Sequence, residues 1–216
     1  MERTGTYLFD FDGTLVDSMP SFVSVMLRIL DEYGVSYGED IVKIITPLGY
    51  HGTALYFKTL GVPASVEELT EKMNRYAKDD YLHRIPAKES VPETLVALRR
   101  SGASLNVLTA SPHAVLDPCL VRLGLWELFD NVWSCDDFET TKADPAIYVR
   151  AAEWMGVDAS DVIFVDDNVN AVRTAAEAGV HAYGIYDASS ADLKCEMRAV
   201  SERYLERLSD LLNEKE

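Results

Sequence analysis

Short runs of consecutive apolar residues, separated by longer amphipathic stretches, form the main pattern of this 216-residue chain. Uninterrupted apolar, β-rich runs of this kind are typical of strands that are buried on both faces of a parallel sheet. A shorter and more polar run at 131–134 is a candidate for a further strand. The pattern predicts four principal strands, at 6–9, 105–108, 162–165 and 182–185.

Between these runs the apolar residues recur at helical spacing, with Pro near the predicted starts or Gly just after the predicted ends. The predicted helices are 92–100, 112–123, 145–155 and 168–178. Alternating strands and helices predict an α/β fold, a Rossmann-like doubly wound parallel sheet covered on both faces. A last helix is predicted because Val200, Tyr204, Leu208 and Leu211 lie at helical spacing.

The stretch from 18 to 90 breaks this alternation and is predicted to be all-helical. Glycines and prolines mark turns between its predicted helices. These helices are 22–33, 39–45, 53–60 and 65–82. We therefore predict an α/β core formed by residues 1–17 and 91–216, with residues 18–90 as an inserted helical cap domain.

A formal net charge of −16 disfavours binding to nucleic acid or to an anionic membrane surface. No apolar run approaches the ~20 residues of a membrane-spanning helix, and the polar start of the chain lacks a secretory signal. The three cysteines have no metal-like spacing. We expect reduced thiols and a cytoplasmic protein that binds neither nucleic acid nor membranes.

Two carboxylates, Asp10 and Asp12, follow the first predicted strand in the run DFDGTLVDS at 10–18. One carboxylate of such a pair can attack an electrophile, and the other can carry a proton. Together they can hold a hard divalent cation, which prefers oxygen ligands. The simpler alternative is a strand that ends in an ordinary Asp-Gly turn.

Three more polar features lie at or just beyond predicted strand ends. Thr109 follows the predicted strand 105–108, Lys142 precedes the predicted helix 145–155, and Asp166 and Asp167 follow the strand 162–165. Each alone has an ordinary explanation, as a helix cap or a solvent-facing lysine. However, the carboxyl ends of parallel strands share one edge of a doubly wound sheet, so these side chains can converge there. Adjacent carboxylates also repel each other, and a cation would relieve that repulsion.

These elements, in this order, resemble the signature of the haloacid dehalogenase superfamily in its phosphatase form, and the resemblance covers nearly the whole chain. The helical insert resembles the cap of the phosphoglycolate phosphatase and β-phosphoglucomutase branch. The resemblance implies that Asp10 is the nucleophile and a Mg²⁺ ligand. It implies that Asp12 is the general acid/base, with its backbone carbonyl on the metal, and that Asp166 is the third metal ligand.

The resemblance also implies a phosphoryl site. Thr109 and the Ala110 amide would bind a phosphoryl oxygen, and Lys142 would orient Asp10 and neutralise the phosphoryl charge. The acidic motif departs from the family pattern, since Asp167 and Asn170 stand where the family often has Ser and Asp. The sequence leaves open which of these two residues helps to hold the metal.

The function implied is a Mg²⁺-dependent phosphomonoesterase that hydrolyses a small phosphorylated metabolite through an aspartyl phosphate, as a monomer or weak homodimer. We expect His51, in a predicted cap loop at 46–52, to contact the leaving group. A phosphosugar mutase is the first alternative, weakened because that loop contains no Arg or Lys; Lys43, Lys58 or Arg75 would have to substitute. Asp12 argues against a dehalogenase. A non-catalytic binding protein on this fold is a further alternative, although every chemical position is filled.

Overall fold

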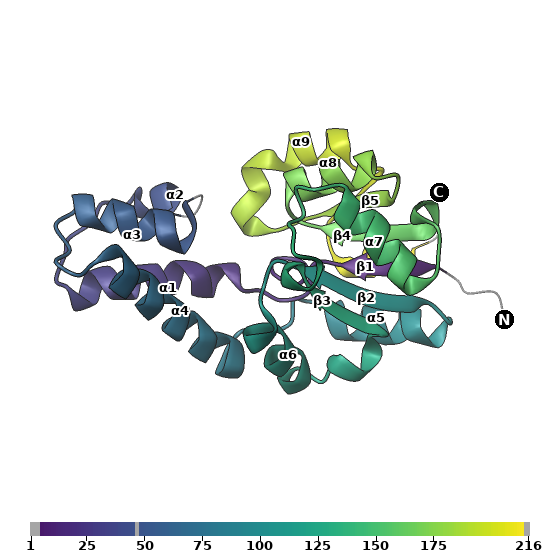
Figure 1. The fold of residues 1–216 in the computed structure, drawn as a ribbon, viewed down its shortest axis with the longest axis horizontal. Helices are drawn as coiled ribbons and strands as arrows, with labels where there is room; N and C mark the ends of the chain where they lie inside the picture. The colour runs from purple at the N-terminus through teal and green to yellow at the C-terminus, as the bar shows by residue number, and fades with distance from the viewer. Residues whose placement is uncertain (1–4, 46–47, 214–216) are drawn as a thin grey trace. The chain divides into compact units, whose positions relative to one another are not determined.

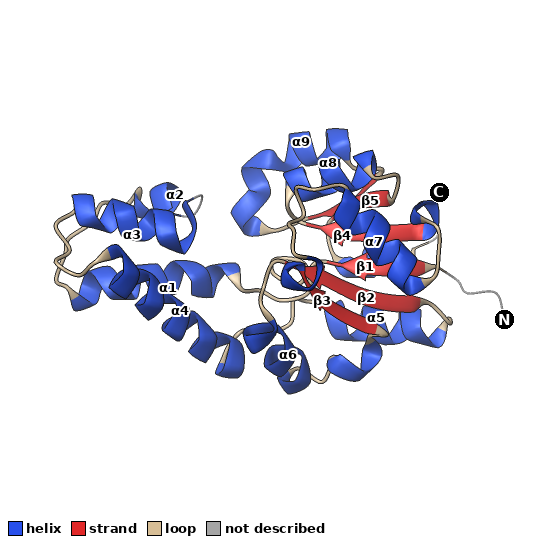
Figure 2. Cartoon of the chain, in the orientation of Figure 1, coloured by secondary structure: helices blue, strands red, loops and turns tan. Residues whose placement is uncertain are grey.

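A six-stranded parallel sheet with the strand order β3-β2-β1-β4-β5-β6 forms the centre of the larger part of the molecule. The computed structural model describes residues 5–45 and 48–213. Figures 1 and 2 show β3, β2, β1, β4 and β5 side by side. The strands are β1 (Thr6–Phe9), β2 (Ser104–Thr109), β3 (Asn131–Ser134), β4 (Val162–Asp166), β5 (His181–Ile185) and β6 (Arg203–Leu205).

Apolar side chains cover both faces of this sheet. Leu8 and Phe164 belong to a buried cluster with residues of the helices α7 (Ala146–Met155) and α8 (Val169–Glu177). Because side chains alternate along a strand, Phe9 and Val165 face the opposite side, and both are also fully buried. The predicted α/β fold is therefore confirmed. The helices of this part are α5 (Val91–Arg100), α6 (His113–Arg122), α7 (Ala146–Met155), α8 (Val169–Glu177) and α9 (Lys194–Val200).

The predicted C-terminal helix is wrong. Helix α9 ends at Val200, and the backbone turns to an extended conformation at Ser201. Tyr204 then lies in β6, opposite Gly184 of β5, and Leu208 begins a short 3-10 helix, Leu208–Leu212. Backbone hydrogen bonds to the open edge of β5 favour a strand here, so the apolar residues are buried by a strand and a turn instead of one helix face.

Residues 18–85 form a second compact unit with its own apolar core. Phe57 and Met73 are among its fully buried residues. The unit ends at Ile85 rather than at the predicted residue 90, because backbone hydrogen bonds join Asp17 to Pro86 and Lys88 to Leu15 within the other unit. Its helices are α1 (Met19–Glu32), α2 (Ile41–Ile45), α3 (Gly49–Thr59) and α4 (Val66–His83).

The cysteines Cys119, Cys135 and Cys195 are free thiols, and the first two are buried. Across the part of the chain that the structure describes, no helix combines the length and the apolar character needed to cross a membrane.

Candidate active site

Asp10 and Asp166 lie side by side at the carboxyl ends of two neighbouring parallel strands, β1 and β4. β1 and β4 pair in register with Phe9 opposite Val165, and the Asp10 amide donates to the Val165 carbonyl at 2.9 Å. Both residues are buried, with 5% of the surface of Asp10 and 1% of the surface of Asp166 exposed to solvent. Asp167 follows directly, and one ligand oxygen from each of these three aspartates lies within 4.8 Å of the others.

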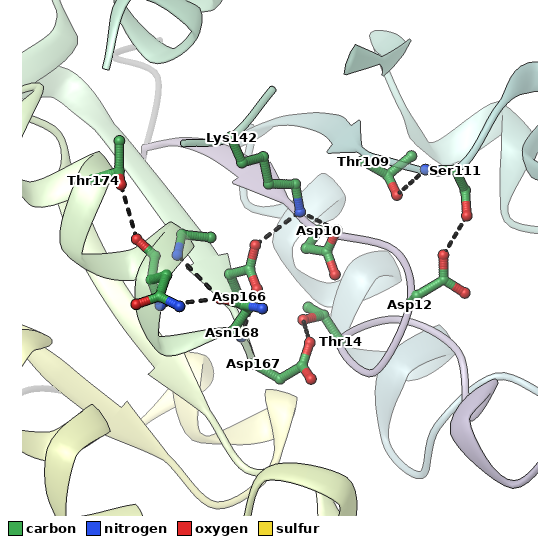
Figure 3. A network of polar contacts seen from close by, with 12 residues as sticks. Asp10, Asp12, Thr14, Thr109, Ser111, Lys142, Asp166, Asp167, Asn168 and Thr174 are labelled. Carbon is green, nitrogen blue, oxygen red and sulfur yellow. Dashed lines mark hydrogen bonds and ion pairs between the residues drawn. The ribbon is translucent and has the colours of Figure 1, made fainter. Parts of the chain in front are cut away.

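Lys142 joins the first two carboxylates. Its ammonium Nζ donates to Asp10 Oδ1 and, at 2.8 Å, to Asp166 Oδ2, as Figure 3 shows. The Tyr148 hydroxyl lies 3.0 Å from the Lys142 carbonyl and holds the backbone of the lysine in place. Burial alone would lower the pKa of this ammonium, but Asp10 and Asp166 outweigh that effect and raise it. Lys142 therefore stays charged, and the convergence predicted for it is observed.

The electrostatics of this group would favour a bound cation. Burial, together with Asp166 and Asp12, raises the pKa of Asp10 to about 7 despite Lys142. Burial and the same kind of repulsion raise the pKa of Asp167 well above its ordinary value. When ionised, the three carboxylates outnumber the one ammonium by two charges, which one divalent cation would balance. Since all the donors are oxygens, Asp10, Asp166 and Asp167 fit a hard cation such as Mg²⁺.

The turn after β1 places Gly13 against Asp167. Gly13 has φ +78°, and a Cβ added to it would lie 2.5 Å from Asp167 Oδ2. Glycine is needed here both for the left-handed backbone and for space. The next residue, Thr14, is fully buried and donates from Oγ1 to Asp167 Oδ1 at 3.3 Å. The turn thus holds the Asp167 carboxylate beside the other two.

Asp12 points to the other side of this turn. Its Oδ2 accepts a hydrogen bond from Ser111 Oγ, away from Asp166 and Asp167 in Figure 3. Thr109 is 1% exposed and its Oγ1 accepts the Ser111 amide at 3.1 Å, whereas Ala110 is exposed. The loop after β2 therefore faces the Asp12 carboxylate. The metal ligand predicted from Asp12 is its backbone carbonyl, which stays a prediction.

Asp167 and Asn170, between which the acidic motif left the choice open, have different surroundings. The Asp167 carboxylate joins Asp10 and Asp166, whereas Asn170 is exposed and accepts a hydrogen bond from Arg173 at 2.8 Å. The Asn168 side chain caps α8, and the Asn168 backbone amide donates to Asp166 Oδ1 at 2.7 Å. The start of α8 therefore also fixes the orientation of Asp166.

His51 lies in the first turn of α3 and is exposed. The predicted loop at 46–52 is wrong from Gly49 onward, because helix α3 begins there, and Thr46 and Pro47 lie outside the described residues. The cost of glycine in a helix is about 1 kcal/mol, and the buried Phe57 on the same helix offsets it. The contact between His51 and a substrate stays a prediction.

Lys58, one of the substitute cations for a mutase, is committed to the backbone of its own unit. Its Nζ donates to the carbonyls of Val62 at 2.8 Å, Pro63 at 3.3 Å and Ala64 at 2.8 Å. It therefore closes the connection between α3 and α4. Arg75 lies over the ring of Tyr76, with 5.6 Å to its centroid.

The predicted site did not include Thr14, Ser111 and Lys88, although each contacts it or the turn after β1. Thr14 and Ser111 had a signal, since each stands within two residues of a predicted site residue, Asp12 or Thr109. Lys88 had none, because its side-chain acceptors come from segments near 13 and 186.

Comparison with known proteins agrees with this geometry. A family model described as haloacid dehalogenase-like hydrolase matches residues 7–185. Pyrophosphatase PpaX of Bacillus velezensis is 29% identical over 98% of this chain and 96% of its own length. N-acetylmuramic acid 6-phosphate phosphatase of Pseudomonas aeruginosa is 29% identical over 82% of this chain and 79% of its own length.

Among solved structures, a Thermotoga maritima protein provisionally assigned as a beta-phosphoglucomutase shares the fold, with a TM-score of 0.85 and 24% identity over 97% of each chain. A haloacid dehalogenase family hydrolase of Deinococcus radiodurans, solved with phosphate and sodium, has a TM-score of 0.80 and 22% identity, covering 96% of this chain and 93% of its own. The family model covers most of the chain, including Asp10, Lys142, Asp166 and Asp167. The chain therefore belongs to the haloacid dehalogenase-like hydrolases.

Proposed function

We propose that this chain is a Mg²⁺-dependent phosphomonoesterase that hydrolyses a small phosphorylated metabolite through an aspartyl phosphate at Asp10. The observation that carries the proposal is the buried Asp10, bound by Lys142 beside Asp166 and Asp167. Asp12 stands two residues away, on the far side of the same turn. The two relatives described above act, by their names, on a pyrophosphate and a sugar 6-phosphate, which supports a phosphorylated substrate.

The carboxylates of Asp10, Asp166 and Asp167, with the backbone carbonyl of Asp12, would hold the cation. When bound, Mg²⁺ neutralises charge on the phosphoryl oxygens and acts as a Lewis acid. Lys142 adds a fixed positive charge at the same place. A local positive site is needed because the chain carries a formal charge of −16, which repels a phosphorylated substrate.

Asp10 and Asp12 carry out the two chemical steps of the proposed reaction. An Asp10 oxygen attacks phosphorus and forms an acyl phosphate, while the bond to the ester oxygen breaks and Asp12 gives that oxygen a proton. Asp12 next takes a proton from water, which attacks the same phosphorus and releases Asp10 and phosphate. Thr109 and the Ala110 amide bind a phosphoryl oxygen in both steps.

We assign the unit 18–85 the role of a cap that excludes water and reads the leaving group, with His51 as a contact. Cytoplasmic location and a monomer or weak homodimer stay predictions. A phosphosugar mutase is weakened further because the Lys58 ammonium is already bound to three carbonyls. A non-catalytic protein is disfavoured because each chemical position is filled.

A panel of phosphorylated metabolites, assayed for released phosphate with Mg²⁺, tests the proposal. We expect turnover of at least one ester, lost in Asp10→Asn and retained in Asp161→Asn. Asp161 is a suitable control because it is an exposed aspartate immediately before β4, at the strand end opposite Asp166. Turnover by Asp10→Asn at wild-type rates would remove Asp10 from its role, and no turnover of any ester by the wild type would remove the function.

A further inference from the structure

The Lys88 ammonium donates hydrogen bonds to oxygens of two loops that lie far apart in the sequence. Its Nζ donates to the Gly13 carbonyl at 2.6 Å, the Tyr186 carbonyl at 2.8 Å and Asp187 Oδ2 at 2.8 Å. An ammonium has three N–H groups, and each has an acceptor here. Only 20% of the Lys88 side chain and 4% of the Asp187 side chain are exposed. This contact is therefore a built, desolvated clamp rather than a surface ion pair.

Both sides of the clamp are firmly held. Asp187 Oδ1 accepts hydrogen bonds from the Ser189 amide at 2.9 Å and the Ser189 hydroxyl at 2.6 Å, which leaves Oδ2 for Lys88. On the other side, the Lys88 amide donates to the Leu15 carbonyl at 3.0 Å. The lysine thus joins the turn after β1 at two points and anchors it to the loop after β5.

The turn that Lys88 holds is the one that carries Asp12. The Gly13 amide donates to Val16 at 2.9 Å, and the Gly13 carbonyl accepts from Lys88, so both backbone groups of Gly13 are fixed. Asp12 immediately precedes this fixed residue, and its carboxylate meets Ser111 Oγ. The direction of the Asp12 side chain therefore depends on a backbone that Lys88 holds at Gly13 and Leu15.

We propose that Lys88 is a positioning residue that acts through the Gly13 carbonyl to aim Asp12 at the leaving oxygen, an inference that rests on the proposed phosphatase function. Lys88 touches no reacting atom. Its role is to keep the proton donor in place, and misplacement of a catalytic group by about 1 Å can cost about 100-fold in rate.

The dependence of the rate on the leaving group separates this role from simple support of the fold. An alkyl phosphate needs a proton on its leaving oxygen, whereas dinitrophenolate leaves without one. The parameter kcat/KM reports the steps from binding through formation of the aspartyl phosphate. We expect Lys88→Met to lower kcat/KM roughly 10- to 100-fold for an alkyl phosphate and less than about threefold for dinitrophenyl phosphate.

The matched control is Lys194→Met, which removes a surface lysine whose Nζ lies 2.7 Å from Glu206 Oε1. This variant should leave kcat/KM unchanged for both esters. Equal losses with both esters, or no loss, in Lys88→Met would overturn the positioning role. If that variant does not fold, Lys88→Arg keeps the charge without the three-acceptor geometry and is judged by the same ratio of the two losses.

Hydrogen exchange tests the clamp independently of turnover. Amides of the segment 11–17 should exchange at least about tenfold faster in Lys88→Met than in Lys194→Met, because a lost anchor lowers the local opening free energy. Unchanged exchange there would refute the clamp. If the wild type hydrolyses no ester at all, the proposed function fails, while the exchange result still decides whether Lys88 holds the turn.

Discussion

Burial sets the chemistry of Asp10. Its carboxylate is buried beside Asp166 and Asp167, so a lone charge there is unfavourable, and the pKa of Asp10 rises to about 7. Lys142 counters this rise but does not cancel it. At neutral pH Asp10 therefore depends on a second positive charge to be fully ionised, and full ionisation is what a nucleophilic carboxylate requires.

This predicts how the metal-free protein responds to pH. The ordinary pKa of Asp10 is 3.8, so between about pH 4 and 7 the folded state holds a proton that the unfolded state has lost. The free energy of unfolding should therefore fall as pH rises through this window, by at most a few kcal/mol, and level off above it. Thermal melts from about pH 5 to 8 with EDTA measure this.

Asp10→Asn should reduce the slope of that profile, to which Asp167 also contributes because its pKa is raised too. It should also raise the melting temperature at pH 8 by several degrees, since a neutral amide replaces the buried charge. The exposed control Asp161→Asn should leave the profile unchanged. A wild-type profile in which stability rises steadily across the window would contradict the electrostatic account of the site.

The strand ends were the most predictable elements. The apolar strands and the polar residues that follow them are local in sequence, so β1, β4 and the convergence of Asp10, Lys142 and Asp166 could be predicted. The strand β6 could not, because the open edge of β5 decides its conformation and not the period of its apolar residues. The start of α3 at Gly49 was missed because glycine usually marks a turn.

The turn after β1 has no room for a side chain at Gly13. Gly13→Ala should lower activity at least about tenfold and weaken Mg²⁺ binding, because the new Cβ would clash with Asp167 at 2.5 Å. Gly124→Ala is the matched control, since Gly124 has φ +70° with nothing within 4 Å of an added Cβ. Both variants should lose about 1 kcal/mol of stability from backbone strain.

Enzyme assays, calorimetric titration with Mg²⁺ and thermal melts distinguish the two variants. Equal activity in Gly13→Ala and Gly124→Ala would show that the space beside Asp167 has no part in the site.

In the whole molecule, the contacts that could not be predicted from the sequence join segments that lie far apart along the chain. Lys88 reaches Gly13 and Asp187, and Thr14 reaches Asp167, across gaps of more than seventy residues. Such pairs have no sequence spacing to mark them, whereas motif residues next to strand ends have one.

Both the activity and the stability of the folded protein should depend on Mg²⁺. Removal of Mg²⁺ with EDTA should abolish turnover, and Mg²⁺ at 100 times its Kd should stabilise the fold by about 2.7 kcal/mol. In Asp167→Asn that stabilisation should shrink. Ca²⁺ should stabilise the protein but inhibit it, because its looser coordination would misplace Asp10. Full activity after exhaustive chelation would contradict the metal site.

The helical unit should govern which ester is used. His51→Ala should change the relative kcat/KM values among metabolite esters and leave a small artificial ester nearly unaffected, because leaving-group contacts act on discrimination between substrates. His181→Ala, which removes an exposed histidine at the start of β5, is the matched control. A uniform loss across all esters, or an unchanged profile, would remove His51 from the specificity argument.

The proposed mechanism places a covalent phosphoryl group on Asp10. In a single turnover with a phosphate ester that carries radiolabelled phosphorus, stopped with acid, the label should transiently remain on the protein and be released by hydroxylamine. Peptide mapping should then place it on the peptide that contains Asp10, and Asp10→Asn should never carry it. Product formation with no protein-bound label at any time, or label on another residue, would contradict the account.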